Sequence, residues 1–252
     1  MRERGVTAPV FVHGELAGLR PGAVPVLSGA EGRHAVSVRR LRAGEEIVLT
    51  DGEGTGVFGT VAAVEGRDRL SVEVTEVRRE PEPRPSVTVV QALAKGDRGE
   101  LAVETMTETG VDTIVPWSAS RCVTRWRGER GEKSLAKWRS TAREAGKQAR
   151  RLRFPRITGP MTTEEVAGLL AGASFAGVLH EAGGEPLATV VLPADGGIVL
   201  VVGPEGGVSP QELEAFEEAG ARPCRLGPSV LRTSTAGTAA AALVLGRTGR
   251  WG

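Results

Sequence analysis

The chain has 252 residues, 40% of them hydrophobic and 25% charged, which suits one large or two modest globular domains. No apolar run approaches the ~20 residues that a membrane span needs, and the first residues lack the hydrophobic segment of a signal peptide. Cys122 and Cys224 lie far apart and the three histidines are isolated, so the spacing supports no metal or redox site. We therefore expect a reduced, cytoplasmic protein with no metal and no membrane partner.

The net charge is only +1, but it is unevenly distributed. Residues 121–156 hold 13 Lys or Arg and 3 Glu, whereas the rest of the chain holds 19 basic and 28 acidic residues. Arginine is abundant along the whole chain, but this does not explain why acidic residues avoid one segment. The asymmetry indicates a polyanionic partner.

Residues 1–77 are expected to form a small β-barrel domain. Residues 46–50 and 57–61 are apolar, β-rich runs separated by the turn dipeptide Asp51-Gly52. Residues 70–77 alternate between apolar and polar positions, as a half-solvated antiparallel strand does.

Glycines at positions 52, 54 and 56 follow an apolar strand and imitate the strand–GxGxG signature of Rossmann-type methyltransferases. That signature requires a helix directly after the glycines. Because the next residues, VFGTVAAV, are again β-rich, we interpret the glycines as a hairpin loop.

The charged, Pro-rich residues 78–85 are typical of an extended linker and mark a domain boundary. Residues 86–252 then alternate between strand and helix patterns, which predicts an α/β domain. Strands are expected at 87–93, 112–116 and 175–180, with helices that start near residues 95 and 162. The first of these helices should end at Gly110.

The basic segment contains a helical pattern. Six apolar residues recur at spacings of three and four: Leu135, Trp138, Ala142, Ala145, Ala149 and Leu152. Basic residues lie off this face: Arg139, Arg143, Lys147, Arg150 and Arg151. This side of the helix is either simply solvated or contacts nucleic acid, and the small number of acidic residues favours nucleic acid.

Residues 198–202 form an uninterrupted apolar run, which is typical of a strand buried on both faces. The sequence GPEGG at 203–207 ends this strand and can bring backbone close to a ligand. Ser209 and Glu212 then form the pattern of a capping box around Pro210. This arrangement places backbone N–H groups at the carboxyl end of a parallel strand, where open α/β sheets bind ligands.

A second glycine corner follows at 226–232, between a short strand and an Ala-rich helix that starts near Thr233. Each corner alone could be an ordinary βα turn. Because the two strand–loop units are close in sequence, we expect both corners to border one cavity.

GPEGG at 203–207, followed by LGPSVLRTSTA at 226–236, resembles the signature of the SPOUT methyltransferases. More narrowly, the chain is similar to the 16S ribosomal RNA (uracil-N3)-methyltransferase family. The resemblance extends over nearly the whole chain, through HAVSVRRLRAGE at 34–45, QALAKGD at 91–97, ETGV at 108–111 and Arg121-Cys122.

The resemblance implies an N-terminal PUA-like β-barrel and a C-terminal α/β domain with a trefoil knot. It also implies a homodimer that transfers a methyl group from S-adenosylmethionine to N3 of a uridine in 16S ribosomal RNA, either free or in the small ribosomal subunit. Two residues depart from the family pattern: Ser234 stands where Glu is common, and Thr105 where Lys is common.

The resemblance and the loop positions together give three groups of candidate site residues. Arg232 would face the acceptor, and Glu205 would lie at the mouth of the pocket or cap the following helix. The cofactor would contact Leu179, His180, Gly203, Pro204, Gly206, Gly207, Leu226, Gly227, Val230, Leu231 and Thr233. RNA would contact Arg33, Arg39, Arg40, Arg42, Arg143, Lys147, Gln148, Arg150 and Arg151.

Three alternatives remain open at this point. The enzyme could methylate a ribose 2′-oxygen or a different RNA. The chain could also be a non-catalytic RNA-binding or ribosome-assembly protein. A Rossmann enzyme built on Gly52 and its neighbours would require a helix where we expect a strand.

Overall fold

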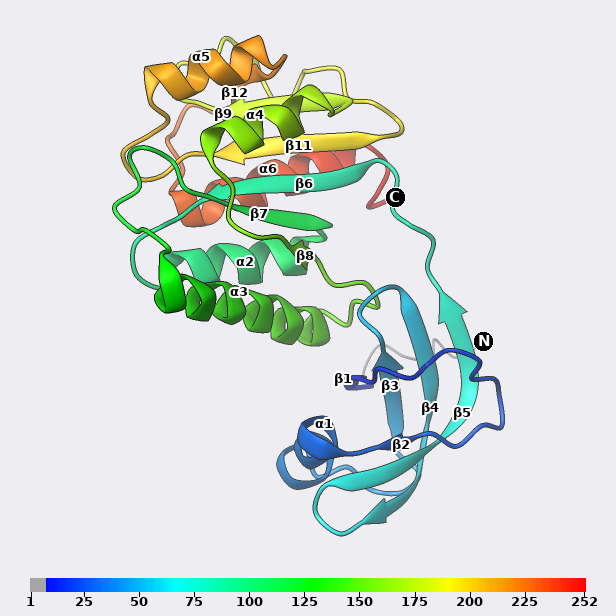
Figure 1. The fold of residues 1–252 in the computed structure, drawn as a ribbon. Coiled ribbons are helices and arrows are strands. Elements are labelled where there is room, and N and C mark those ends of the chain that lie inside the picture. The colour runs from blue at the N-terminus through cyan, green and yellow to red at the C-terminus, as the bar shows by residue number, and fades with distance from the viewer. Residues whose placement is uncertain (1–7) are drawn as a thin grey trace. The chain divides into compact units, whose positions relative to one another are not determined.

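A computed structural model describes residues 8–252 (Figure 1). The chain divides into two compact units. The first contains residues up to Glu82 together with Gly146–Phe154, and the second contains Pro83–Ala145 and Pro155–Gly252. A single boundary at residues 78–85 therefore does not describe the segment Gly146–Phe154, which packs with the N-terminal unit. No helix within residues 8–252 has the length and apolar character needed to cross a membrane.

The first unit is built on a curled five-stranded sheet with the order β1-β3-β4-β5-β2 (Figure 1). Its strands are β1 (Val10–Val12), β2 (Val26–Leu27), β3 (Glu46–Thr50), β4 (Thr55–Glu65) and β5 (Arg69–Arg79). β1 pairs with β3 in parallel, and the other pairs are antiparallel. A short helix α1 (Gly29–Arg33) continues into a π-helical turn at His34–Val38.

Buried apolar residues alternate with more exposed residues along β5, so one face of this strand is buried. Leu70, Val72 and Val74 are buried, whereas the residues between them face outward or are only partly covered. This confirms the half-solvated strand that the alternation predicts. The strand runs on to Arg79, so the first two residues of the predicted linker belong to the sheet.

The glycines at 52–56 form a hairpin turn between β3 and β4, as predicted. The Asp51 carboxylate accepts hydrogen bonds from the backbone N–H groups of Glu53 and Thr55, at 2.7 and 3.0 Å. Burial alone would raise the pKa of Asp51, but the hydrogen bonds outweigh it and hold this pKa below its ordinary value. A strand follows the turn, so the Rossmann alternative is wrong.

The same glycines accommodate the segment Gly146–Phe154. A Cβ atom at Gly52 would lie 2.9 Å from Cδ2 of Phe154, and one at Gly56 would lie 2.6 Å from the Leu152 side chain. Backbone hydrogen bonds from Phe154 to Gly52 and from Gly54 to Leu152 hold the segment in place. The absence of side chains at the turn therefore allows this segment to pack closely against it.

The helix predicted in the basic segment is α3 (Gly128–Gln148), which is shorter than the apolar pattern indicates. Leu135 and Trp138 are buried on it as predicted. The prediction is wrong beyond Gln148, because Arg150 adopts a left-handed φ of 55° and the helix cannot continue through it. Leu152 is buried, but against the residues of the first unit.

The second unit contains a seven-stranded parallel sheet with the order β10-β12-β9-β11-β6-β7-β8. Its strands are β6 (Ser86–Ala92), β7 (Thr113–Trp117), β8 (Arg156–Ile157), β9 (Phe175–Leu179), β10 (Glu185–Pro186), β11 (Gly197–Val202) and β12 (Arg222–Arg225). The predicted α/β fold with a parallel sheet is confirmed.

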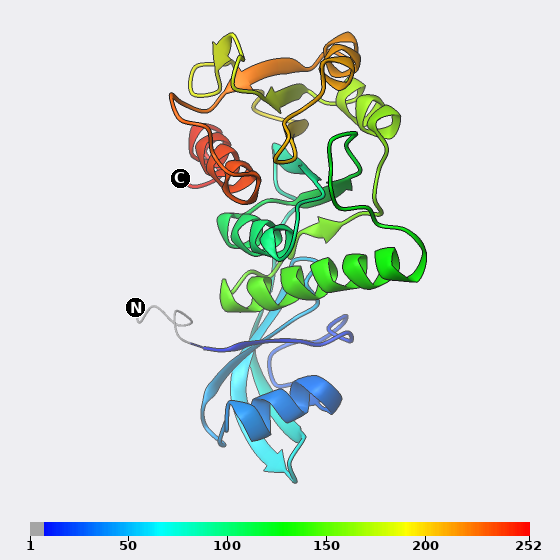
Figure 2. The same ribbon diagram turned by 90° about the vertical axis from the view of Figure 1, so that its left-hand side faces the viewer.

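Helices cover both faces of this sheet, with α4 (Thr163–Ala171) and α5 (Pro210–Glu218) on one side (Figure 2). α2 (Arg98–Thr109) and α6 (Thr233–Arg247) pack together on the other side. As predicted, α2 ends at Gly110, which has a left-handed φ of 114°.

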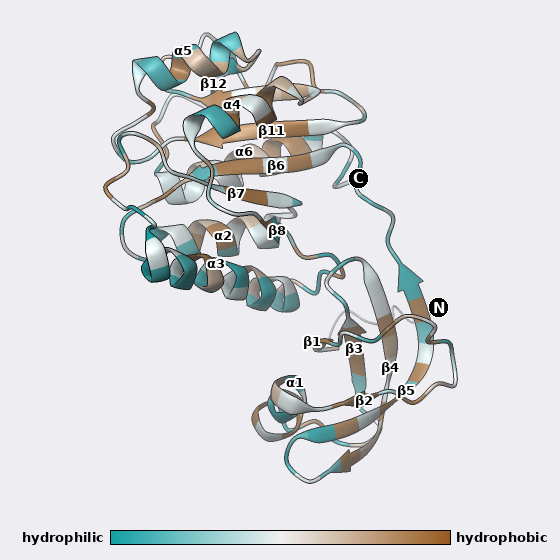
Figure 3. Ribbon diagram, viewed as in Figure 1, coloured by the Kyte–Doolittle hydropathy of each residue, from teal (hydrophilic) through white to brown (hydrophobic). Residues whose placement is uncertain are grey.

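The strand β11 lies between β9 and β6 and forms the centre of the core. Val178, Leu200 and Val90, from these three strands, are completely buried. Figure 3 shows the hydrophobic colouring of β6 and β11 and the hydrophilic colouring along α3. The apolar run of β11 is explained by the helices that remove both faces of the sheet from water.

Candidate active site

Four neighbouring strands, β12, β9, β11 and β6, end at the same edge of the parallel sheet. The loops that follow β9, β11 and β12 border two adjoining cavities of about 590 and 680 Å³. Both cavities are lined by Leu179, His180, Glu181, Val230, Leu231 and Ala236. The carboxyl edge of the sheet thus borders both cavities, as the strand–glycine–helix pattern predicts.

The first glycine corner, residues 203–207, borders the smaller cavity. A Cβ atom at Gly203 would lie 2.9 Å from a methyl group of Val208, so this close turn requires glycine. Gly207 has a left-handed φ of 72°, and its N–H donates a 2.8 Å hydrogen bond to the carbonyl of Pro204. The loop therefore presents its backbone to the cavity.

The helix after this corner begins as predicted. The Ser209 hydroxyl accepts a bond from the N–H of Glu212, and the Glu212 carboxylate accepts from the N–H of Ser209. The other carboxylate oxygen of Glu212 accepts from the N–H of Ser120, at 2.6 Å. Burial alone raises the pKa of Glu212, but the bonds from Ser120 and Ser209 outweigh it and hold the pKa below its ordinary value.

The second corner borders the larger cavity through Leu226, Gly227, Val230 and Leu231. Val230 is 77% exposed and Leu231 40% exposed, which is unusual for aliphatic side chains beside a cavity. The two corners thus border adjoining cavities that share lining residues, among them Val230 and Leu231.

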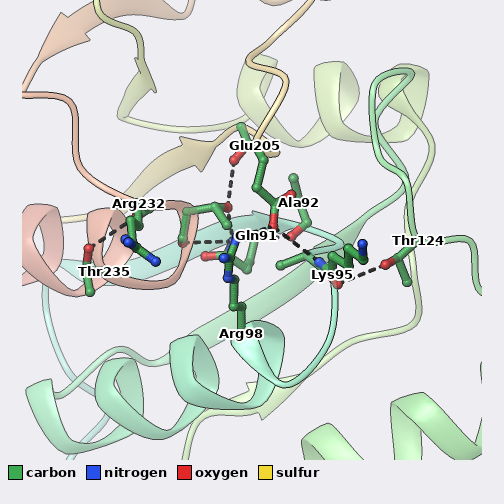
Figure 4. Close-up of polar contacts among 11 residues, drawn as sticks. Gln91, Ala92, Lys95, Arg98, Thr124, Glu205, Arg232 and Thr235 are labelled. Carbon is green, nitrogen blue, oxygen red and sulfur yellow. Dashed lines mark hydrogen bonds and ion pairs between the residues drawn. The ribbon is translucent and has the colours of Figure 1, made fainter.

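Glu205 does not cap the following helix, which is capped by Ser209. Its Oε1 atom accepts from the backbone N–H of Lys95 at 3.3 Å and lies 3.4 Å from Nη1 of Arg98 (Figure 4). Glu205 thereby joins the first glycine corner to the N-terminal end of α2, at the mouth of the smaller cavity.

Two arginines that sequence reasoning gave no role also line the smaller cavity. Arg98 lies at the start of α2, after β6, and Arg121 lies in the loop after β7. Nη1 of Arg121 donates to the carbonyls of Gly206 and Val208, at 3.0 and 3.5 Å. Their positions after strands of the parallel sheet are the signal that could have identified them.

Arg232 is the N-cap residue of α6, and its side chain is exposed on the lining of the smaller cavity. Its carbonyl accepts bonds from the N–H groups of Thr235 and Ala236, which fixes the backbone of this residue. Arg98 and Arg121 line the same cavity, so three arginines border it, and Glu205 pairs with one of them, Arg98. Such a site favours a group that is negatively charged or gains negative charge.

His180 follows β9 and lines both cavities. Its Nδ1 atom accepts a 3.2 Å hydrogen bond from the N–H of Ala182. An accepting Nδ1 carries no proton, so the neutral ring has its N–H at Nε2. The ring is therefore set up as a hydrogen-bond donor.

Most predicted RNA-contacting residues are exposed, but Lys147 is not. Its side chain is 3% exposed, and its Nζ atom lies 3.1 Å from Oε1 of Glu31 within the first unit. The prediction that Lys147 contacts RNA is wrong, because an ammonium group buried in an ion pair does not reach a phosphate. The exposed or partly exposed members are Arg33, Arg39, Arg40, Arg42, Arg143, Gln148, Arg150 and Arg151.

Ser234 and Thr105, which depart from the family pattern, occupy defined positions. Ser234 is buried in the first turn of α6. The Thr105 hydroxyl lies 2.6 Å from that of Thr238 and joins α2 to α6. Both residues thus contribute to helix packing.

Comparison with known proteins matches each of the two units to a protein family. Residues 80–245 match the family of the RNA methyltransferase domain, and residues 27–75 match the RNA methyltransferase PUA domain. A Ribosomal RNA small subunit methyltransferase E from Mycobacterium bovis is 45% identical over 234 residues, which cover 91% of this chain and 89% of the relative. The chain belongs to the ribosomal RNA small subunit methyltransferase E family.

Two solved structures extend the comparison. The ribosomal RNA small subunit methyltransferase E from Neisseria gonorrhoeae, bound to S-adenosyl methionine, has a TM-score of 0.83 and 30% identity, and covers 94% of this chain and 97% of its own. A Legionella pneumophila methyltransferase in complex with the same cofactor has a TM-score of 0.84 and 26% identity, and covers 96% and 98%. The family resemblance seen in the sequence is confirmed.

Proposed function

We propose that this protein transfers a methyl group from S-adenosylmethionine to N3 of a uridine in 16S ribosomal RNA. The observation that carries the proposal is the position of the two glycine corners, which border adjoining cavities at the carboxyl edge of one parallel sheet. Membership of the ribosomal RNA small subunit methyltransferase E family supports the reaction and the substrate.

The cavities suit the cofactor in size and lining. Each has the volume of a typical small-molecule site, and their common wall combines the aliphatic Leu179, Val230 and Leu231 with the donor ring of His180. Backbone groups of Gly203, Pro204, Gly206, Gly207, Leu226, Gly227 and Thr233 would complete the contacts. When bound, S-adenosylmethionine supplies a methyl group that is activated by its sulfonium centre.

The acceptor imposes its own requirements. N3 lies on the Watson–Crick edge of uracil and carries a proton, so the base must be unpaired and N3 must release that proton to solvent. Negative charge then spreads over the ring, and the Arg232 guanidinium would stabilise it at the smaller cavity. Glu205, held by Lys95 and Arg98, would keep the first glycine corner in place for this step.

RNA would be held mainly through its phosphates. Exposed arginines on the first unit, among them Arg33, Arg39, Arg40 and Arg42, can provide such contacts, and so can Arg143, Gln148, Arg150 and Arg151. Contacts of this kind give affinity without sequence choice, so the target uridine would be selected by the shape of the RNA and by the site.

The resemblance also supports a homodimer, a C-terminal trefoil knot and a cytoplasmic location, where 16S ribosomal RNA is assembled. The exposed aliphatic side chains of Val230 and Leu231, beside both cavities, fit a wall that a ligand or a second copy would cover. We include these three points in the proposal.

Mapping of modified nucleosides tests the proposed reaction. 16S ribosomal RNA from cells with and without the protein would be digested and analysed by mass spectrometry. A 3-methyluridine that depends on the protein is the expected result, whereas a 2′-O-methyl nucleoside would support the ribose alternative. If calorimetry detected no binding of S-adenosylmethionine, the non-catalytic alternative would replace the proposal.

A further inference from the structure

Gln91, the penultimate residue of β6, has a completely buried side chain that does not line either cavity. Its Nε2 atom donates to the hydroxyl and the carbonyl of Thr233, at 3.1 and 3.3 Å, and to the carbonyl of Ala92, at 3.2 Å. Figure 4 shows Gln91 between Arg232 on one side and Lys95 on the other.

Thr233 links Gln91 to the first glycine corner. Its hydroxyl accepts from Gln91 and donates its own proton to the carbonyl of Gly203, at 2.8 Å. Thr233 directly follows Arg232 and is the first residue of α6. One amide group therefore connects the end of β6, the end of β11 and the residue next to the arginine that would face the acceptor.

The carbonyl oxygen of the same amide group makes no such hydrogen bond among the described residues. Oε1 of Gln91 is buried and has no hydrogen-bond partner among the described residues. A buried acceptor without a partner reduces stability, so Oε1 gives no reason for a glutamine at this position. The donor geometry at Nε2 is thus the feature that requires glutamine at this position.

We propose that Gln91 is a positioning residue for methyl transfer. Its Nε2 group holds Thr233 against Gly203, which fixes the start of α6 and with it the Arg232 guanidinium relative to the first glycine corner. This inference rests on the proposed function and adds a residue that touches neither the cofactor nor the acceptor. Displacement of a reacting group by about 1 Å can cost about 100-fold in rate, so the effect should be measurable.

Gln91→Met removes the donor and keeps the length of the side chain. We expect kcat for methylation of 16S ribosomal RNA to fall about 10- to 100-fold, with an apparent melting temperature close to that of the wild type. Gln211→Met, which alters an exposed glutamine on α5, is the matched control and should leave kcat unchanged. Wild-type kcat in Gln91→Met would overturn the proposal.

A double-substitution cycle separates positioning from general stability. If Gln91 acts through Arg232, then Arg232→Ala should cost much less in the Gln91→Met background than in the wild type. Full additivity of the two losses would contradict the inference.

Thr233 offers a second test that leaves Gln91 intact. Thr233→Val removes the hydroxyl link and should reproduce the loss in kcat. Thr233→Ser keeps a hydroxyl group and should retain most of the wild-type kcat. Should Gln91→Met fail to fold, this pair decides alone: equal kcat values for the Val and Ser variants would refute the role. A wild-type protein that bound S-adenosylmethionine but methylated no RNA would instead refute the proposed function.

Discussion

Oε1 of Glu212 accepts a 2.6 Å hydrogen bond from the backbone N–H of Ser120, although 92 residues separate the two. Glu212 belongs to the capping box of α5, and Ser120 precedes the arginine that lines the smaller cavity. The buried carboxylate therefore has two tasks. It completes the start of a helix, and it holds the loop that carries Arg121 beside the first glycine corner.

Glu212→Gln should reduce stability by an amount that depends on pH. The folded protein lowers the pKa of Glu212, so the carboxylate stabilises it above the unfolded pKa of about 4.3, and this contribution is lost as pH falls through the lower folded value. We expect the variant to lose about 3 kcal/mol at pH 7 and the deficit to shrink below about pH 4. Urea unfolding at several pH values measures this, and a deficit that is constant with pH would contradict it.

Arg232→Ala should lower kcat by about 100-fold or more, because the guanidinium would no longer stabilise charge on the acceptor. The exposed side chain touches the cavity from the start of α6, so cofactor affinity should change little. Arg222→Ala, at the first residue of β12 and with 60% side-chain exposure, is the matched control. Unchanged turnover in Arg232→Ala would remove this residue from the mechanism.

Gly227→Val should reduce S-adenosylmethionine affinity in a protein that still folds. A Cβ atom at Gly227 meets nothing within 4 Å, so the added side chain enters the larger cavity and not the core. We expect at least about a 10-fold increase in Kd, a loss of about 1.4 kcal/mol in binding free energy. Gly184→Val, where a Cβ atom also meets nothing, is the control, and equal affinities in both variants would place the cofactor elsewhere.

Lys147→Met should destabilise the first unit and have no direct effect on RNA affinity. The side chains of Lys147 and Glu31 are 3% and 14% exposed, so removing the ammonium leaves a buried carboxylate without this partner. Loss of one member of a buried pair costs about 3 to 5 kcal/mol. Chemical denaturation checks this, and the double variant Lys147→Met with Glu31→Leu should recover part of the stability.

Arg39→Ala should weaken RNA binding in a salt-dependent manner. For single-stranded RNA, removal of one arginine–phosphate ion pair reduces the slope of log K against log salt by about 0.7. Arg39 is exposed on the first unit, and Arg222→Ala on the second unit serves as the control. Filter binding of a 16S ribosomal RNA fragment between about 50 and 200 mM salt, a range over which such ion pairs have large effects, gives the slopes. Identical slopes for the wild type and Arg39→Ala would show that this arginine does not bind phosphate.

Local features were predictable because a few neighbouring residues determine them. The capping box at Ser209, the turn at Asp51 and the end of α2 at Gly110 each depend on bonds or dihedral angles within about five residues. The buried strand β11 followed from its apolar run, since such a strand needs helices on both faces. The family resemblance, which covers nearly the whole chain, then predicted the fold and the activity from the order of the motifs.

The basic segment shows where local pattern fails. Apolar spacing continues through Leu152, but the helix ends at Gln148, and Leu152 is buried by packing in the first unit. A periodic pattern records which residues are buried and does not identify the surface that buries them. Lys147 was misjudged for the same reason, because its carboxylate partner lies 116 residues away in sequence.

The sequence by itself determined the types of the longer helices and strands, the two glycine corners and the family of the chain, because these depend on neighbouring residues or on motif order. Only the tertiary structure decided that Arg98, Arg121 and Arg232 meet at one cavity and that Gln91 bonds to Thr233. The strand order places β6 beside β11, although about a hundred residues separate them in sequence. Contacts between the loops of such strands depend on how the strands assemble, and no local preference of the chain specifies that.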